Sequence, residues 1–426
     1  MKNSILLFLL FCFGGNHQTG AQVPTYHNDI APILSNKCAT CHANNKYSNI
    51  QLASYKEVAQ NSKLILYVLD KGLMPKWKAD TIFCHFSNER KITTQESNQI
   101  RQWISTGLKE GKHVRVIDKK KKLDKLKTVW KYYQPKIEID LHNKIKDSLI
   151  YIYIPFKESN SFFVNGYSFL PGNSNVIHHA NCWIYQTQND TDSTIFYKKI
   201  NAYTDGIVRE KDAYPEDIIF GCPWVPGSSE INFPVNSGFK MPQSGYIIFE
   251  IHVSPNAGFN TIQPKLALQI TEKQPDREVK HFVLGTNFNG TYSAPLIVNP
   301  NSYNEITITD TLPDDVSIFA IGPHMHYIGR KFEAFAISPT HDTIPIVKIN
   351  DWDFNWQEYY VPQKLLVLHA GTSIVVKVFF DNTSNNPYNP FHPPQTIIEG
   401  IKTTNEMINL DLLLLFYKAG DENITQ

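Results

Sequence analysis

The stretch Cys38-Ala39-Thr40-Cys41-His42 carries the most specific chemistry in the sequence. Its two thiols can form thioethers with porphyrin vinyl groups, and the adjoining imidazole is then held where it meets the iron. The motif therefore predicts a covalently bound c-type haem with His42 as the first axial ligand. A zinc or redox Cys-x-x-Cys followed by an accidental His is the alternative, but no second Cys pair exists to complete a zinc site.

Met74 is our predicted second axial ligand of this haem. It follows the haem His by some thirty residues and stands in a loop after Gly72, before Pro75. A small cytochrome c supplies its second ligand at such a position. A Met in the hydrophobic core is the alternative, and His85 and His27 are reserve candidates for the ligand.

The residues around the motif predict a small all-α, cytochrome c-like domain over 22–112. Apolar residues at helical spacing precede the motif at Ile30, Ile33 and Leu34, and others follow Thr93 from Ile100 to Leu108. Residues 113–135 include Lys119–Lys122 and show no clear apolar face, which predicts a linker. A basic patch that docks an acidic partner is the alternative for this segment.

From about residue 136 the sequence is typical of β-structure. Alternating β-branched and aromatic residues predict strands, with no long amphipathic helix between them. Two antiparallel, jelly-roll-like sandwich domains are expected, over 136–274 and 275–426. One small sandwich domain contains fewer residues than this β region has. The expected strands are 149–154, 246–253, 280–284, 305–308, 373–380 and 410–417.

Histidines in the β region form a second set of candidate metal ligands. His324 and His326 are two residues apart, so on a strand both imidazoles point to one face. His178 and His179 would point to opposite faces, so a shared metal requires a bulge or a strand end there. His252 lies inside an apolar strand. Taken singly, each of these is more often a hydrogen-bonded structural residue than a ligand. Taken together, imidazoles without clustered carboxylates or spare thiols suit copper.

The order of these motifs resembles the copper type II ascorbate-dependent monooxygenases, over about residues 136–420. Besides the histidines, the resemblance rests on four further segments: Pro171-Gly172-Asn173, Trp224 to Pro226 with Phe233-Pro234, Gly329, and Glu406-Met407. The haem segment resembles that of bacterial versions fused to a cytochrome c. The resemblance implies that His178, His179 and His252 hold an electron-transfer copper. It also implies that His324, His326 and Met407 hold the oxygen-activating copper.

Departures from that family concern the substrate pocket. The peptide-hydroxylating members have an Arg that clamps the substrate carboxylate where this chain has Gly322. Asn409 matches a substrate-side position, but Asp411 stands where a Tyr is expected and Ile408 where a Cys is common. A peptide with a free carboxylate is therefore not the expected substrate.

The first residues predict export. Lys2 precedes an apolar run from Ile5 to Phe13, and Thr19-Gly20-Ala21 offers a cleavage site, so residues 1–21 are expected to be a signal peptide. Phe11 before Cys12 argues against lipid anchoring. Covalent haem with export indicates the periplasm of a Gram-negative bacterium, and no later apolar run is long enough for a membrane span.

The cysteine count and the net charge limit which disulfides can form and which partners can bind. Among Cys84, Cys182 and Cys222, at most one disulfide can form within the chain, and Cys182 with Cys222 is the preferred pair, with the connectivity left open. A content of 42% hydrophobic residues is ample for folded cores. A net charge of +1 gives no electrostatic basis for nucleic-acid binding.

Together these features predict a copper-dependent monooxygenase that hydroxylates a C–H bond of a small organic substrate. Its cofactors would be one haem c and two copper ions, with dioxygen as co-substrate. Electrons would arrive through the haem from a periplasmic donor, from ascorbate or from another reductant. A non-catalytic haem and copper electron-transfer or copper-handling protein is the first alternative. An adhesion protein with structural histidines is the second.

Overall fold

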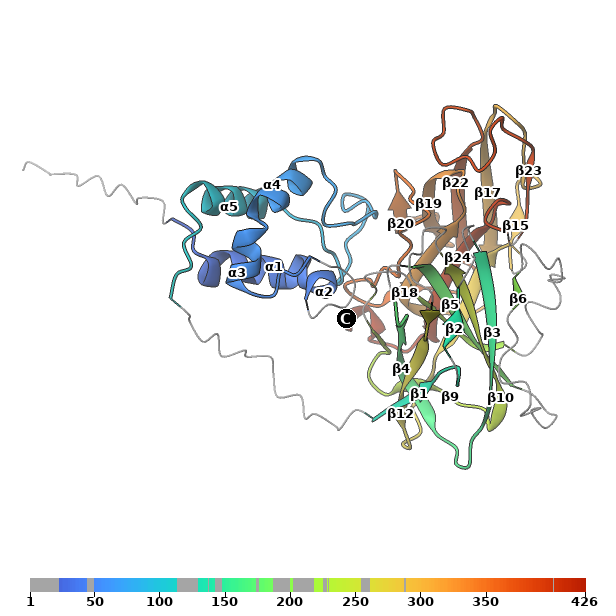
Figure 1. Cartoon of the computed structure of the whole chain (residues 1–426). Coiled ribbons are helices and arrows are strands. Elements are labelled where there is room, and N and C mark those ends of the chain that lie inside the picture. Colours follow the sequence, from blue (N-terminus) through green and yellow to red (C-terminus); the bar gives the residue numbers. More distant parts are fainter. Residues whose placement is uncertain are drawn as a thin grey trace, which may run out of the picture.

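The structure is a computed structural model, in which helices and strands occupy separate parts of the chain (Figure 1). It describes residues 23–43, 50–112, 129–136, 138–141, 148–173, 176–186, 200–201, 218–224, 228, 230–253, 261–286, 289–400 and 402–426. The predicted signal peptide and most of the predicted linker lie outside these residues. None of the described helices is long and apolar enough to cross a membrane.

The N-terminal part is helical, as the sequence predicts. Two of its helices begin with capping boxes, in which Ser54 and Thr93 each exchange hydrogen bonds with a Glu three residues later. Ile30, Val58, Ile100 and Trp103 are fully buried where the helices meet. The helices are a π-helical turn η1 (Tyr26–Ile30), α1 (Ala31–Lys37), α2 (Ala39–His42), α3 (Tyr55–Gln60), α4 (Ser62–Asp70) and α5 (Thr94–Ser105).

The first β region packs two sheets over one hydrophobic core. One sheet has the order β1-β12-β4-β9-β13, with β8 beside β4, and the other has the order β6-β3-β10-β5-β7. Their inward residues, such as Phe169 and Phe249, contact one another across the core. The strands are β1 (Val129–Tyr133), β2 (Ile139–Asp140), β3 (Ser148–Lys157), β4 (Phe163–Leu170), β5 (Ile177–Gln186), β6 (Ile200–Asn201), β7 (Ile218–Trp224), β8 (Ile231–Asn232), β9 (Ser237–Lys240), β10 (Ser244–Val253), β11 (Thr261–Ile262), β12 (Lys265–Thr271) and β13 (Arg277–Glu278).

The second β region repeats this construction. Its sheets have the orders β14-β24-β18-β21 and β15-β17-β22-β19-β20. The strands are β14 (Lys280–Gly285), β15 (Thr291–Tyr292), β16 (Ile297–Val298), β17 (Tyr303–Thr311), β18 (Val316–Met325), β19 (Gly329–Ile337), β20 (Thr343–Ile349), β21 (Leu366–Leu368), β22 (Ser373–Asp381), β23 (Ile397–Ile398) and β24 (Ile408–Phe416), followed by the short 3-10 helix η2 (Asp421–Asn423). All six predicted strands are confirmed, although Tyr417 lies beyond the end of β24.

Strand β24 explains how the two sandwiches join. Leu412 and Leu414 belong to the core of the second sandwich, while Leu413 and Leu415 belong to the core of the first. A strand buried on both faces reads as a continuous apolar run, as residues 412–415 do. The sheet that contains β24, with the order β14-β24-β18-β21, therefore contributes side chains to both hydrophobic cores.

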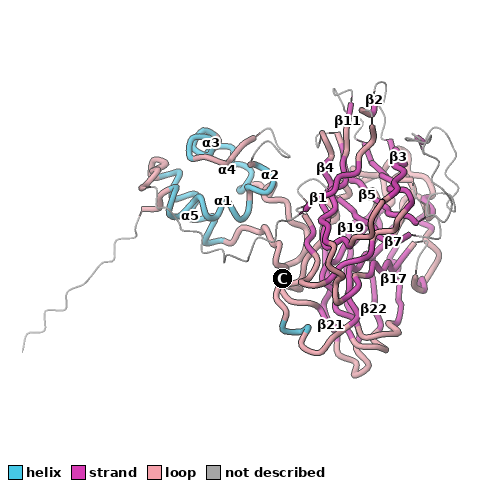
Figure 2. Tube along the Cα trace, turned by 90° about the horizontal axis from the view of Figure 1, so that it is seen from below, coloured by secondary structure: helices cyan, strands magenta, loops and turns pink. Residues whose placement is uncertain are grey.

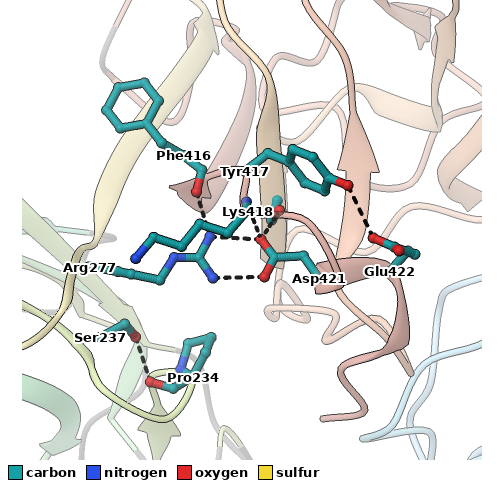
Figure 3. Close-up of polar contacts among 9 residues, drawn as sticks. Pro234, Ser237, Arg277, Phe416, Tyr417, Lys418, Asp421 and Glu422 are labelled. Carbon is teal, nitrogen blue, oxygen red and sulfur yellow. Dashed lines mark hydrogen bonds and ion pairs between the residues drawn. The ribbon is translucent and has the colours of Figure 1, made fainter.

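Arg277 fastens the two sandwiches together at their edge. It stands in β13, which pairs in parallel with β9 of the first sandwich. Its guanidinium donates to both carboxylate oxygens of Asp421, at 2.8 and 2.7 Å, and to the carbonyl of Phe416 (Figure 3). Burial alone would raise the pKa of Asp421, but hydrogen bonds from Arg277 and Ser317 outweigh burial and hold it below its ordinary value.

Two segments differ from the predicted domain boundaries. Strand β1 begins at Val129, inside the predicted 113–135 linker, because its residues pair with β12 of the first sandwich. Residues 77–90, within the predicted helical domain, pack against the second sandwich, and Ala79 and Phe86 are part of its core. Backbone bridges join Ala79 to Ile349 and Phe86 to Pro362. The helical part, separate from the strands in Figure 2, is thus attached to the β part through this segment.

Candidate functional site

A cavity of about 310 Å³ in the helical part brings together four of the predicted haem residues. Cys38, Cys41, His42 and Met74 all line it. The rest of the lining is mainly aliphatic, contributed by Leu34, Ile50, Leu52, Leu64, Ile65, Val68, Leu69, Ile92 and Ile100. Two thiols, an imidazole and a thioether around an apolar space fit a covalently attached haem.

The orientation of His42 supports its predicted role. Its Nδ1 lies 2.9 Å from the carbonyl oxygen of Ile50, so Nδ1 carries the proton and Nε2 keeps its lone pair. That tautomer is the one an iron ligand needs. The reserve candidates lie elsewhere: His27 is beside Glu110, and His85 is beside Glu89. Neither is among the described residues that line the cavity.

The two cysteines of the motif lack the character of redox-active thiols. Burial, followed by the charge of the neighbouring Cys41, raises the pKa of Cys38 to about 12. Burial also raises the pKa of Cys41. Reactive Cys-x-x-Cys pairs have a lowered pKa instead. This disfavours the redox alternative for the motif.

A second pocket, of about 90 Å³, lies between the two sandwiches. It is lined by predicted ligands from both: His179 from the first, and His324, His326 and Met407 from the second. The imidazole centres of His179 and His252 are 5.0 Å apart, and those of His179 and His324 are 6.2 Å apart. The fold thus gathers the two predicted copper groups into one cluster.

The backbone at His178 has the irregularity that the sequence argument requires. His179 pairs with His252 across β5 and β10, but Ile177 pairs with the next residue, Val253. His178 is therefore the extra residue of a β-bulge. The position of its side chain lies outside the described part of the structure, so its role as a ligand stays a prediction.

His324 stands near the end of β18 and His326 directly after it, with imidazole centres 5.1 Å apart. The amide nitrogen of Gln357 donates to the carbonyl of Phe354 at 2.8 Å, which turns its Oε1 toward His324. His324 Nδ1 then donates to that Oε1 at 2.7 Å. His326 Nδ1 lies 3.1 Å from the carbonyl of Asn405. Both rings are thereby fixed in the tautomer that leaves Nε2 for a metal.

Burial disfavours the charged form of both histidines. Burial lowers the pKa of His324, and burial together with the neighbouring His324 ring lowers the pKa of His326 well below its ordinary value. Met407 is 5% exposed and adds a thioether to the same pocket. Neutral imidazoles with a thioether form a donor set that fits copper, especially in its cuprous state.

Glu406 holds the backbone around these ligands. Its carboxylate accepts hydrogen bonds from the backbone N–H groups of His326 and Ile328, at 2.9 and 2.8 Å. The side chain is almost fully buried, at 1% exposed. Burial raises its pKa to about 8, although these N–H donors act in the opposite direction. Glu406 therefore ties the turn after His326 to the start of β24.

Among the described residues, no group of three or more His, Cys, Asp or Glu side chains is arranged to hold a metal ion. Each predicted copper set has one member that is not a described His, Cys, Asp or Glu side chain. Met407 is a thioether, and the side chain of His178 is not among the described ones. The residues that are described supply two oriented imidazoles and one thioether to the second set.

The pocket lining also includes Gly322, Asn409 and Asp411, three positions that the resemblance relates to the substrate. A Cβ on Gly322 would lie 2.7 Å from the ring of Tyr359, so this Gly leaves room for that ring. Asp411 lines the pocket and accepts a hydrogen bond from His281 Nε2 at 2.9 Å. Asn409 also lines the pocket, and it pairs with His324 across β24 and β18.

The predicted disulfide is not formed. Cys182 and Cys222 are both free and fully buried, although they stand directly opposite each other on β5 and β7. Burial raises the pKa of each thiol well above its ordinary value, so neither is inclined to ionise and react. Cys84 is free as well, and its thiol donates to the carbonyl of Ile346.

Sequence reasoning missed the segment from Phe354 to Tyr359. The Phe354 ring lies 5.5 Å from that of His179, 5.3 Å from that of His252 and 5.9 Å from that of His326. Gln357, Glu358 and Tyr359 line the pocket. The signal was present as an alternation of aromatic and polar residues from Trp352 to Gln357.

Comparison with known proteins supports the copper assignment at the level of a family. Residues 298–424 match the sequence profile described as "Copper type II ascorbate-dependent monooxygenase, C-terminal domain". The match spans His324, His326 and Met407 and supports a copper-dependent monooxygenase at the family level. No curated protein matches the chain.

Solved structures give only distant likenesses. The structure of PNGF-II in a P21 crystal has a TM-score of 0.29 and 9% identity, over 67% of this chain and 65% of that one. The VP2 subviral particle of infectious bursal disease virus has a TM-score of 0.19 and 8% identity, over 70% of this chain and 74% of that one. The chain thus spans just under two thirds of the PNGF-II chain, and neither likeness bears on function.

Proposed function

We propose that the protein is an exported, periplasmic copper-dependent monooxygenase. It would insert one oxygen atom of dioxygen into a C–H bond of a small organic substrate and reduce the other atom to water, using two electrons and two protons. One observation carries the proposal: the profile match spans His324, His326 and Met407, and these three side chains line a single pocket.

The proposed copper ligand sets are those that the resemblance to the monooxygenase family implies. His324, His326 and Met407 would hold one copper, and His178, His179 and His252 would hold the other. Cys38, Cys41, His42 and Met74 would hold a haem c. Bound copper would supply dioxygen activation and electron storage, and the haem would supply electrons taken from a periplasmic donor, from ascorbate or from another reductant.

The chain's own residues prepare the pocket for this chemistry. Gln357 and Asn405 fix the two imidazoles, and Glu406 fixes the turn that carries His326. No Lys or Arg is among the described residues that line the pocket, whereas Glu250, Glu358 and Asp411 are. A carboxylate on the substrate would therefore find no cationic partner, which favours a substrate without one.

Metal content and oxygen uptake test the proposal. Purified mature protein is expected to bind two copper ions per haem iron and to consume oxygen when a chemical reductant and a suitable compound are present. His324→Ala or Met407→Ala should abolish oxygen uptake and leave the haem spectrum unchanged. His369→Ala is the matched control, because that imidazole lies on the same sandwich but is 62% exposed beside Asp315.

The same measurements separate the alternatives. A protein that binds copper but consumes no oxygen with any of a broad panel of compounds would be an electron-transfer or copper-handling protein. A protein that refuses copper under reducing conditions would have structural histidines. Full oxygen uptake in both His324→Ala and Met407→Ala would show that the second site is misassigned.

A further inference from the structure

Three consecutive residues lie between the two cavities. Trp356 lines the cavity that also contains Cys41 and His42. Gln357 and Glu358 line the pocket that contains His324 and His326. They belong to the connection between β20 and β21, and one stretch of backbone therefore forms part of both walls.

The Trp356 ring is held firmly at the wall of the first cavity. It is 8% exposed, and its indole N–H donates to Glu358 Oε1 at 2.8 Å. The cationic groups of Lys76 and Arg90 lie over the ring, at 5.3 and 5.7 Å from its centre. Arg90 also pairs with Glu358. The indole thus has a single defined position relative to the cavity.

From Trp356 a bonded path leads to a predicted copper ligand. The peptide bond joins Trp356 to Gln357, and Gln357 Oε1 accepts the proton of His324 Nδ1 at 2.7 Å. The path contains covalent bonds and one short hydrogen bond, with no gap through space. Electron tunnelling falls steeply with distance and is carried better by bonds than by gaps, so such a path favours transfer.

The spacing between the two cavities is fixed by the contacts on either side of this path. Asn88 donates to the carbonyl of Tyr359 at 2.8 Å and accepts from the N–H of Val361 at 3.1 Å. Ser87 N–H donates to the carbonyl of Val361 at 2.8 Å. The segment before the helix α5 is therefore joined to this connection by one backbone hydrogen bond, by two hydrogen bonds of the Asn88 side chain and by the buried Arg90–Glu358 pair.

We propose that Trp356 and Gln357 conduct electrons from the haem cavity to the His324/His326 site, rather than first to the His179/His252 group. The inference rests on the proposed function, because it requires haem in one cavity and copper in the other. In that step, haem held by Cys38, Cys41 and His42 would give up one electron and be oxidised from ferrous to ferric, and copper held at His324 would accept it and be reduced from cupric to cuprous. No atom is transferred.

Flash reduction of the loaded, full-length protein tests the route. Haem is reduced by one electron under anaerobic conditions while copper is cupric, and its reoxidation is followed by absorbance, with loss of the cupric EPR signal as the second readout. Trp356→Leu is expected to slow haem reoxidation severalfold, with haem and cupric spectra unchanged. Gln357→Leu is expected to slow it and also to alter the cupric spectrum, because the hydrogen bond to His324 is lost.

Trp352→Phe is the matched control. Trp352 is a buried indole in the same connection, but it packs against Phe332 and lines neither cavity. Its variant should transfer electrons at the wild-type rate.

Two outcomes would overturn the route. One is a wild-type rate in Trp356→Leu with intact haem. The other is a wild-type rate in Gln357→Leu. If Trp356→Leu fails to retain haem, the Gln357→Leu result alone tests the route, because Gln357 does not line the haem cavity. If the wild-type protein itself passes no electron from haem to copper, then electron delivery by haem fails as part of the proposed function, and the route fails with it.

Discussion

The cavity around the predicted haem residues and the pocket around the predicted copper ligands, called here the haem cavity and the copper pocket, are built in opposite ways. The cavity is lined by residues 34–100 with one addition, Trp356, and most of these side chains are aliphatic. The pocket is lined by residues from His179 to Asp411, drawn from both sandwiches, and many of them are polar. A local apolar cavity suits a cofactor attached by one short motif, whereas a pocket between two domains depends on long-range packing to bring its ligands together.

The largest expected effect follows from the independence of the two sites. The double variant Cys38→Ser/Cys41→Ser should lose all covalently bound haem, because no thiol remains to form a thioether. Its copper content should stay at the wild-type level, since no ligand from residues 34–100 lines the copper pocket. Haem staining of the denatured protein and metal analysis measure the two quantities. Loss of copper together with haem would show that the sites are not separate.

Glu406→Ala should cause the next largest effect, and only at the copper pocket. It leaves the buried N–H groups of His326 and Ile328 without their acceptor, at a cost of about 3 kcal/mol of unfolding free energy. Urea unfolding of the variant measures the loss. Glu406→Gln keeps one carbonyl acceptor and should lose less. An equal loss in both variants would mean that side-chain volume, rather than hydrogen bonding, is what matters.

The same contrast explains how far the sequence could lead. Residues 38–42 contain the whole motif on which the haem prediction rests, and the apolar spacing around them predicts the helices that surround the motif. Strands such as Ser148–Lys157 and Ile408–Phe416 were predictable because alternation and apolar runs record which faces are buried. A metal shared by His178 and His179 required either a bulge or a strand end there, and the structure has the bulge.

The features that could not be predicted from the sequence depend on contacts between residues that are far apart in the chain. Nothing local to Gln357 indicates that its amide orients His324, because the two are 33 residues apart and meet only when β18 and the β20–β21 connection pack together. The attachment of Ala79 and Phe86 to the second sandwich was hidden for the same reason. Cys182 and Cys222 were the preferred disulfide because they lie in one predicted domain of an exported protein, yet the two thiols stay free despite their opposite positions.

The Arg277–Asp421 pair tests whether the pocket depends on the joining of the two sandwiches. Arg277→Ala leaves a buried carboxylate without its cation, and we expect a loss of about 3 kcal/mol in unfolding free energy. The haem cavity contains no part of this contact, so the haem spectrum should not change. Chemical denaturation measures the loss, and an altered haem spectrum would contradict the expectation.

Lowering the pH should remove the contribution of the Arg277–Asp421 pair to the unfolding free energy. The pKa of Asp421 is lowered in the folded protein, so its pairing stabilises the fold above the ordinary carboxyl pKa of about 3.9 and is lost as the pH falls through the folded value. The difference in stability between wild type and Arg277→Ala should therefore be constant near neutral pH and shrink in acid. A difference that does not depend on pH in the acid range would show that Arg277 acts through packing instead.

The smallest expected effect lies at the junction of the helical part with the second sandwich. Lys78 pairs with Asp351 at 3.0 Å, but the Asp351 side chain is 71% exposed. Water and salt screen such a pair, so Lys78→Ala should change the unfolding free energy by about 0.5 kcal/mol or less. Arg90→Ala, in the same junction, removes the partner of the buried Glu358 and should cost about 3 kcal/mol. Equal losses in the two variants would mean that every ion pair in the junction contributes alike, whether buried or exposed. The buried Arg90–Glu358 pair would then fix the wall shared by the two cavities less firmly than its contacts indicate.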